Sequence, residues 1–219
     1  MKNELKQHNF KLPNFELELS FNKPVIGIDE VGRGPIAGPV VSCACLFLDY
    51  SVNKNILILF DDSKKLSKKK RKRAFQAINQ LKRNYKLRYA LGFASVDEID
   101  SLNILEATKI SMKRAINKLN YKKTNLIIDG KIDLDLSGYA SYGIIKGDQK
   151  SYSIAISSII AKIHRDRYMR FLSFKFPHYG WNENAGYGTK KHIEQIYKKG
   201  ITNHHRKTFE PIKSLIHSN

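Results

Sequence analysis

Cysteine is scarce in this sequence, with only Cys43 and Cys45 among 219 residues. Two cysteines cannot build a disulfide framework, and a zinc site would need further ligands placed near this pair. The two lie two positions apart in an apolar run, so on a strand both would point to one face and pack as small hydrophobic side chains. We therefore expect two reduced cysteines without a catalytic role.

Long apolar runs are absent as well. The opening residues, MKNELKQHNFKLPNFELELSF, mix charged and apolar side chains too finely for the apolar core of a signal peptide. No later run reaches the length of a membrane span, and the sequence shows neither an internal repeat nor a low-complexity linker. We expect a cytoplasmic protein with no membrane partner.

Acidic residues are few relative to basic ones. Against 39 Lys and Arg stand 20 Asp and Glu, which gives a formal charge of +19. Such an excess creates a field that attracts polyanions, and nucleic acid is the obvious candidate. A genome rich in A and T would also enrich the protein in Lys, Asn, Ile and Tyr, so part of the charge could be ordinary solvated surface.

The length and the 42% hydrophobic content allow one globular domain with a small extension. Residues 1–22 read as a loosely attached N-terminal arm, and residues 23–219 as the domain. Strands interleaved with helices are typical of an α/β fold in which helices cover the faces of one mixed sheet. Periodicity and turn residues predict strands near residues 24–29, 39–48, 86–95, 125–129 and 140–145, and helices near 67–84, 104–119, 151–174 and 192–199.

Four carboxylates end apolar strands or follow them closely: Asp29, Glu30, Asp129 and Asp148. Strand ends are where α/β sheets place their sites, and neighbouring strands lie only about 4.8 Å apart. Acids that converge there repel one another unless a cation lies between them. Carboxylate oxygens suit Mg²⁺ or Mn²⁺ better than Zn²⁺, and two such ions about 3.5 to 4 Å apart support in-line attack on a phosphodiester.

Each acid also has a simpler interpretation. Asp148 could cap a helix, Asp129 before Gly130 could be a turn residue, and Glu30 could be a solvated charge. Asp29 is the hardest to explain in this way, because it directly follows a continuous apolar run.

A glycine-rich segment, Gly32-Arg33-Gly34, comes directly after the first acidic pair. Two glycines allow the backbone to approach a ligand closely and to donate N–H groups to it, as recognition of a ribose 2′-hydroxyl requires. The same three residues could equally form a tight hairpin turn.

Together these blocks make a family resemblance specific. The segment GIDEVGRGPIAGPVV resembles the opening signature of the ribonuclease HII family. Further blocks are similar to that family in the family's own order: DDSKKLSKKKR, LNILEAT, IIDGK, IKGDQKSYSIAISSIIAKIHRDR, HYGW, GYGT and HHRKTFEP. The resemblance covers roughly residues 24–213, and chance does not supply so many ordered blocks.

The resemblance implies a ribonuclease H-like fold, a five-stranded mixed sheet flanked by helices with a small helical C-terminal part. It makes Asp29, Glu30, Asp129 and Asp148 the catalytic acids and the ligands of Mn²⁺ or Mg²⁺, with two ions during catalysis. Residues 23–219 then form the catalytic domain.

The resemblance also assigns nucleic-acid contacts. The loop at residues 32–34 would recognise the ribonucleotide at the scissile phosphate, two residues before the first basic helix would contact phosphates, and a tyrosine in GYGT would pack on the deoxyribose that follows the ribonucleotide. These residues are Gly32, Arg33, Gly34, Ser63, Lys64 and Tyr187. For His204 and His205 we favour a structural or phosphate-adjacent role, because hard ions prefer carboxylates.

The implied activity is a metal-dependent endonuclease, a hydrolase that cuts the RNA strand of RNA–DNA hybrids and cuts 5′ of single ribonucleotides in duplex DNA. The products would be 3′-hydroxyl and 5′-phosphate ends, the role would lie in DNA repair, and the enzyme would be a monomer.

Ribonuclease HIII is less similar, because it carries Lys in place of Arg33 and adds a large N-terminal domain. Two alternatives are a non-catalytic RNA-binding module, which leaves the four acids without purpose, and a junction resolvase, which has no use for GRG and GYGT.

Overall fold

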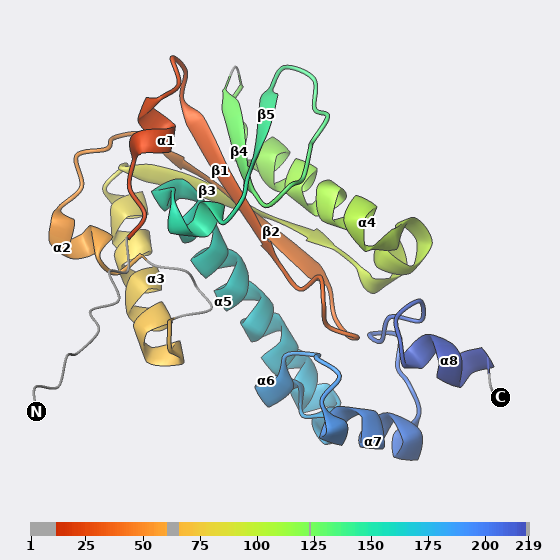
Figure 1. Ribbon diagram of the computed structural model, residues 1–219. Coiled ribbons are helices and arrows are strands. Elements are labelled where there is room, and N and C mark those ends of the chain that lie inside the picture. Colours follow the sequence, from red (N-terminus) through yellow and green to blue (C-terminus); the bar gives the residue numbers. More distant parts are fainter. Residues whose placement is uncertain (1–11, 61–65, 123, 218–219) are drawn as a thin grey trace, which may run out of the picture.

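The computed structural model describes residues 12–60, 66–122 and 124–217. Its central element is one mixed sheet (Figure 1). Its strand order is β3-β2-β1-β4-β5. β1 pairs antiparallel with β2 and parallel with β4, β2 pairs antiparallel with β3, and β4 pairs parallel with β5. The predicted five-stranded mixed sheet is confirmed. The strands are β1 (Val25–Val31), β2 (Val40–Phe47), β3 (Leu87–Ala94), β4 (Asn125–Asp129) and β5 (Ala140–Ile144).

Helices cover both faces of the sheet. On one face Cys43 and Cys45 of β2 pack among residues of α3 (Lys68–Arg83) and α5 (Tyr152–Lys175). On the other face Ala44 and Leu46 pack against α4 (Val96–Leu119). Alternation along β2 therefore assigns odd-numbered residues to the α3–α5 face and even-numbered ones to the α4 face. Both cysteines are buried and free on one face, as predicted.

Helix α4 (Val96–Leu119) begins earlier than the sequence suggested. Ser95 and Glu98 form a capping box at its start, and the helix is interrupted at Asn103, where φ is 69° and ψ is 165°. The Asn103 side chain accepts hydrogen bonds from the backbone N–H groups of Leu105 and Glu106, at 2.9 and 3.2 Å. The predicted start near residue 104 is thus the start of the second segment.

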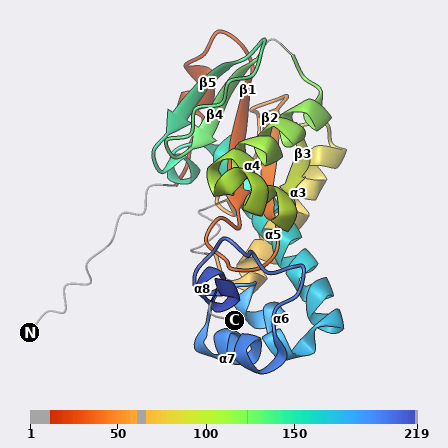
Figure 2. The same ribbon diagram turned by 90° about the vertical axis from the view of Figure 1, so that its right-hand side faces the viewer.

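The chain after α5 forms a small helical part at the far end of that helix (Figure 2). It has its own hydrophobic cluster, in which Tyr179, Trp181 and Ile196 surround Ile36 and Ala37 from the loop after β1. The C-terminal helices therefore pack on the glycine-rich segment that follows the first two acids. The elements are η2 (Pro177–Tyr179), α6 (Trp181–Asn184), α7 (Lys190–Lys199) and α8 (Ile212–His217).

The N-terminal segment differs from the loosely attached arm that we expected, over its described residues. It forms α1 (Glu16–Leu19), and Phe15 contacts the rings of Phe47, Tyr50 and Tyr152. A second short helix, α2 (Lys54–Leu57), follows β2. No helix in the described ranges is long and apolar enough to cross a membrane.

Candidate active site at the ends of β1 and β4

Asp29 and Asp129 lie at equivalent positions of two neighbouring parallel strands. In the β1–β4 register Gly27 pairs with Ile127 and Ile28 with Ile128, and each aspartate is the next residue of its strand. Gly27 and Ile127 face α5, because Gly27 lies against Ser153 and Ile127 packs with Ile154. Alternation therefore directs both aspartates to the α5 face, beside each other at one edge of the sheet.

Asp29 is only 5% exposed. Burial raises the pKa of its carboxyl group well above the ordinary value, and the neighbouring carboxylates of Glu30 and Asp129 raise it further. Hydrogen bonds from Ser158 and from the backbone N–H of Glu30 oppose that shift. The edge of the sheet therefore concentrates negative charge that a cation would stabilise.

Asp148 belongs to a short 3₁₀ turn, η1 (Gly147–Gln149), directly before α5, and it is also 5% exposed. The backbone N–H of Gly147 donates a 2.7 Å hydrogen bond to Oδ1 of Asp129. This bond joins the turn that carries Asp148 to the end of β4. The third predicted acid segment thus reaches the same edge as the first two.

Close packing of α5 on β1 makes this arrangement possible. A Cβ atom on Gly27 would lie 2.3 Å from Oγ of Ser153, so only glycine allows the helix to come this near. The Ser157 hydroxyl donates a 2.8 Å hydrogen bond to the carbonyl oxygen of Gly27. Glycine before the acidic pair is therefore part of the site's construction.

Glu30 lies on the opposite face of β1 from Asp29, at the end of the strand. Arg33 Nη1 lies 3.4 Å from Glu30 Oε1, and the side chains are 43% and 12% exposed respectively. Arg33 is thus an exposed cation beside the acidic edge.

Two buried arginines, Arg165 and Arg206, contact the glycine-rich loop from the protein interior. Gly32 has φ of 103°, and a Cβ atom there would lie 2.2 Å from Nε of Arg165. Arg206, fully buried, donates hydrogen bonds to the carbonyl oxygens of Gly32 (2.5 Å), Arg33 (2.9 Å) and Gly38 (2.7 Å). Its burial lowers the pKa of the guanidinium to about 9. The loop is therefore fixed through its carbonyl groups.

Arg165 also joins this loop to the segment that precedes Tyr187. Arg165 donates to the carbonyl oxygens of Ala37 (3.0 Å), Pro39 (2.9 Å) and Ala185 (2.8 Å). Because the two guanidiniums bond carbonyl groups of the loop at residues 32–39 and of Ala185, that loop and the C-terminal helical part form one unit.

Tyr187 is 50% exposed and lies next to the glycine-rich loop. A Cβ atom on Gly34 would be 3.5 Å from Cε1 of the Tyr187 ring, which is ordinary van der Waals contact. The backbone N–H of Ile36 donates to the carbonyl oxygen of Gly186 at 2.9 Å. The structure thus brings together two segments that the sequence separates by about 150 residues.

Two histidines support the Tyr187 segment from the buried side. His192 and His205 are fully buried, and their Nε2 atoms lie 3.1 Å apart. The indole N–H of Trp181 donates to Nε2 of His192 at 3.0 Å. His205 Nδ1 accepts a hydrogen bond from the backbone N–H of Thr202 at 3.0 Å, so it is part of the packing of the C-terminal helices.

The main residues that sequence reasoning missed are Arg165, Arg206 and His192. Arg165 carried a signal, because it interrupts the apolar face of α5 between Ala161 and Met169, at helical spacing. Arg206 carried none, since it lies in a basic stretch that resembles solvated surface. Two predicted phosphate contacts, Ser63 and Lys64, lie outside the described residues.

The donor chemistry at the sheet edge fits a hard cation. Among residues 12–60, 66–122 and 124–217, no group of three or more His, Cys, Asp or Glu side chains is assembled closely enough to hold a metal ion by itself. Mg²⁺ commonly uses one or two protein carboxylates and takes its other oxygens from water and substrate phosphates. Asp29 and Asp129, with Asp148 in the adjoining turn, supply donors of that kind.

Comparison with known proteins agrees with the geometry. The family model for Ribonuclease HII matches residues 26–211. Ribonuclease HII of Macrococcus caseolyticus is 50% identical over 202 residues, covering 92% of this chain and 72% of that protein. Ribonuclease HII of Wolbachia pipientis is 44% identical over 205 residues, covering 94% of this chain and all of that protein.

Solved structures show the same architecture. Ribonuclease H2 from Pyrococcus horikoshii superposes with a TM-score of 0.70 at 26% identity, covering 89% of this chain and 98% of that one. Bst-RNase HIII in complex with Mn²⁺ superposes with a TM-score of 0.68 at 20% identity, covering 90% of this chain and 70% of that one.

The sheet order and the helices on both faces define a protein with the ribonuclease H-like fold. Because the family model and the close relatives span most of its length, the chain belongs to the ribonuclease HII family, and it is a ribonuclease that acts on the RNA of RNA–DNA hybrids.

Proposed function

We propose that this protein is a divalent-metal-dependent endonuclease that hydrolyses the RNA strand of RNA–DNA hybrids and also cuts 5′ of single ribonucleotides embedded in duplex DNA. The products are 3′-hydroxyl and 5′-phosphate ends, and the biological role is the removal of ribonucleotides from DNA. The observation that carries this proposal is that Asp29 and Asp129 are the next residues after the last paired positions of two neighbouring parallel strands, beside the turn that holds Asp148.

The acids act as the ligand set. When bound, Mg²⁺ or Mn²⁺, two ions during catalysis, supplies charge stabilisation for in-line attack of water on phosphorus. Asp29, Asp129 and Asp148 would hold the ions from the α5 side of the sheet, and Glu30 would complete the set from the other face of the same strand end. The raised pKa of Asp29 supports this role, because a buried carboxylate among other carboxylates favours a bound cation. The Mn²⁺ in Bst-RNase HIII supports Mn²⁺ as a candidate.

The glycine-rich loop and Tyr187 recognise the substrate. The segment Gly32-Arg33-Gly34, in which Arg33 and Gly34 are exposed, recognises the ribose 2′-hydroxyl through its backbone, and the Tyr187 ring packs on the deoxyribose that follows. The closeness of Gly34 to the Tyr187 ring supports this division, because adjacent nucleotides would meet adjacent recognition elements. The carbonyl groups held by Arg206 keep the loop in a fixed conformation, which favours a substrate that fits without rearrangement.

The remaining expectations concern partners and location. Ser63 and Lys64 contact phosphates of the substrate, and the charge of +19 raises the local concentration of nucleic acid. We also propose that the enzyme works as a monomer in the cytoplasm.

Because phosphate contacts release counterions, Lys64→Ala should weaken hybrid binding and reduce the slope of log K against log salt by about one unit.

A cleavage assay tests the proposal. The substrates are a DNA duplex with one ribonucleotide, a uniform RNA–DNA hybrid and a DNA duplex of the same sequence, each with and without Mn²⁺ or Mg²⁺. We expect metal-dependent cutting of the first two and none of the third. Binding without cleavage would indicate a non-catalytic RNA-binding protein, and cutting of the all-DNA duplex would indicate a different nuclease.

A further inference from the structure

A basic groove lies between α3, α5 and α6, with a volume of about 530 Å³. We call it the α3–α5 groove. Its lining combines the N-terminal half of α3, the middle of α5 and the start of the C-terminal helical part. Six cationic side chains line it: Lys68, Arg71, Lys72, Lys162, Arg167 and Arg170.

The acids of the groove neutralise only part of this charge. Asp166 and Glu183 are the carboxylates in its lining. Asp166 is already paired with Arg71 at 3.2 Å and with Lys162 at 2.6 Å. In the part of the chain that the structure describes, Lys68, Lys72, Arg167 and Arg170 form no ion pair with a carboxylate, and all four are exposed. The groove therefore retains a net positive charge that faces solvent.

The floor of the groove includes two buried aromatic side chains. Phe75 and Trp181 contribute to the lining and are 8% and 1% exposed. The guanidinium of Arg167 lies over the Phe75 ring, 5.0 Å from its centre. A cation held against an aromatic ring has a restricted position, which lowers the entropy lost when it binds an anion.

The groove is continuous with the proposed recognition site. Ala185 lines it, and only Gly186 separates Ala185 from Tyr187, a distance of at most about 7 Å along the chain. The Ala185 carbonyl oxygen accepts a hydrogen bond from Arg165, which also holds the loop after residues 32–34. A nucleic acid placed against Tyr187 therefore lies at the rim of the groove.

We propose that the α3–α5 groove binds the phosphodiester backbone of one strand of the substrate duplex beyond the cleavage site. This inference rests on the proposed function. Each strand presents one charge per about 3.4 Å of duplex axis, so a repeating array of anions matches cations distributed over two helices. The groove extends the enzyme's footprint past the ribonucleotide and adds affinity without adding sequence preference.

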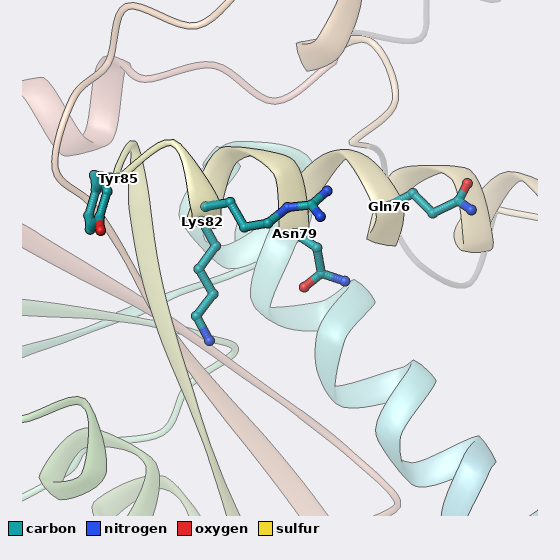
Figure 3. A pocket seen from close by; sticks show the side chains of 5 residues that line it. Gln76, Asn79, Lys82 and Tyr85 are labelled. Carbon is teal, nitrogen blue, oxygen red and sulfur yellow. The ribbon is translucent and has the colours of Figure 1, made fainter.

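A second hollow provides the contrast. It has a volume of about 710 Å³ and lies on the C-terminal half of α3, lined by Gln76, Asn79, Lys82, Arg83 and Tyr85 (Figure 3). This second hollow adjoins the start of β3. Asp29, in contrast, lies level with Leu91 in the strand register, farther along β3. The two cations of the hollow are exposed on the same helix but lie away from the proposed path of the duplex.

These two hollows give matched variants for the test. The groove variant is Lys72→Gln with Arg170→Gln, and the control variant is Lys82→Gln with Arg83→Gln. Each pair removes one Lys and one Arg from exposed positions, so the net charge changes equally. Affinity is measured by fluorescence anisotropy in EDTA, over a range of salt concentrations. The ligands are a short duplex that ends at the deoxynucleotide proposed to contact Tyr187, before the groove, and a long duplex that continues for a full helical turn beyond that nucleotide.

For the long duplex, we expect the groove variant to bind several-fold more weakly than the control, with the slope of log K against log salt reduced by about two units. On the short duplex the two variants should bind alike, and unchanged circular dichroism and thermal unfolding show that both are folded. Equal affinities and salt slopes of the groove variant and the control variant on the long duplex would overturn the proposal. An acidic polypeptide would then be the better candidate for binding in the groove. An equal loss on both duplexes would also overturn the proposal. Failure of the wild type to cut either ribonucleotide substrate would instead contradict the proposed function.

Discussion

His192 donates its Nδ1 hydrogen to the carbonyl oxygen of Tyr187 over 2.8 Å. A carbonyl can only accept, so this bond places the ring hydrogen on Nδ1 and leaves Nε2 of His192 as an acceptor for Trp181 and His205. His205 then carries its hydrogen on Nε2 and accepts from Thr202 at Nδ1. Both histidines are therefore neutral, and this neutral pair fixes the backbone beside the exposed Tyr187 ring.

Acid should destabilise this arrangement. Burial, followed by the proximity of His192, lowers the pKa of His205 to about 3, whereas an unfolded histidine has a pKa of about 6.5. Between these values the unfolded chain binds more protons than the folded one. The free energy of unfolding is therefore fully retained above about pH 6.5 and falls as the pH decreases toward 3, by at most about 1.4 kcal/mol per unit for one histidine.

Urea unfolding at pH 7.5 and pH 5, followed by the fluorescence of Trp181, measures this effect. His205→Gln removes the titrating ring and should unfold more easily at pH 7.5, with a smaller difference between the two pH values. If the wild type and His205→Gln lost equal stability on acidification, His205 would not be the titrating group.

Asp29→Asn or Asp129→Asn should abolish cleavage while the protein stays folded and still binds hybrid duplex. The raised folded-state pKa of Asp29 means that burial and the neighbouring carboxylates destabilise its charge in the folded protein relative to the unfolded chain, so removing that charge should keep or raise the free energy of unfolding. Single-turnover cleavage and urea unfolding of each variant provide the measurement. Full activity in either purified variant would exclude its aspartate from the catalytic set.

Tyr187→Phe and Tyr187→Ala should differ sharply. Phe keeps the ring, whereas Ala loses a stacking surface worth about 1 to 3 kcal/mol. Because a deoxyribose follows the cut only at a junction, the loss for Ala should be larger on a single embedded ribonucleotide than on a uniform hybrid. Values of kcat/KM for both variants on both substrates decide the matter. Equal slowing of both substrates by Tyr187→Ala would reduce the residue to a support for its loop.

Arg206→Met should release the glycine-rich loop. The substitution leaves the carbonyl oxygens of Gly32, Arg33 and Gly38 without their buried donor, and an unsatisfied buried group costs about 1 to 3 kcal/mol. We expect a clear fall in the free energy of unfolding and a higher KM for the embedded ribonucleotide. Arg83→Met, at an exposed position of α3, serves as the control and should change neither. Unaltered KM in Arg206→Met would mean that the loop holds its conformation without this arginine.

Glu18→Ala should show that the N-terminal segment supports the turn with Asp148. The Glu18 carboxylate is 2% exposed and accepts hydrogen bonds from the Ser151 hydroxyl at 2.7 Å and the Ser153 backbone N–H at 2.9 Å. Its loss at the start of α5 should cost about 1 to 3 kcal/mol and lower kcat. Thermal unfolding and cleavage are compared with Glu16→Ala, whose side chain is exposed in the same helix. Equal effects of the two substitutions would contradict a specific role for Glu18.

Much of the fold followed from local patterns. The apolar runs of β1, β2 and β4, the Ser67 cap of α3 and the continuous apolar face of α5 each have a short-range physical cause that the sequence displays. The break at Asn103 and the docking of Glu18 did not follow. Both depend on backbone conformations and partners that the local sequence leaves open.

The sequence by itself determined which residues could do chemistry: the four acids at strand ends, the glycine pair and the family to which their order belongs. Tertiary structure alone decided that β4 lies parallel beside β1, which brings Asp129 to Asp29 across 100 residues. It also decided that Arg165 and Arg206 are buried and donate hydrogen bonds to carbonyl groups of the loop. The physical reason is that charge and hydrogen-bonding capacity are properties of single residues, whereas burial and proximity arise only when distant segments pack together.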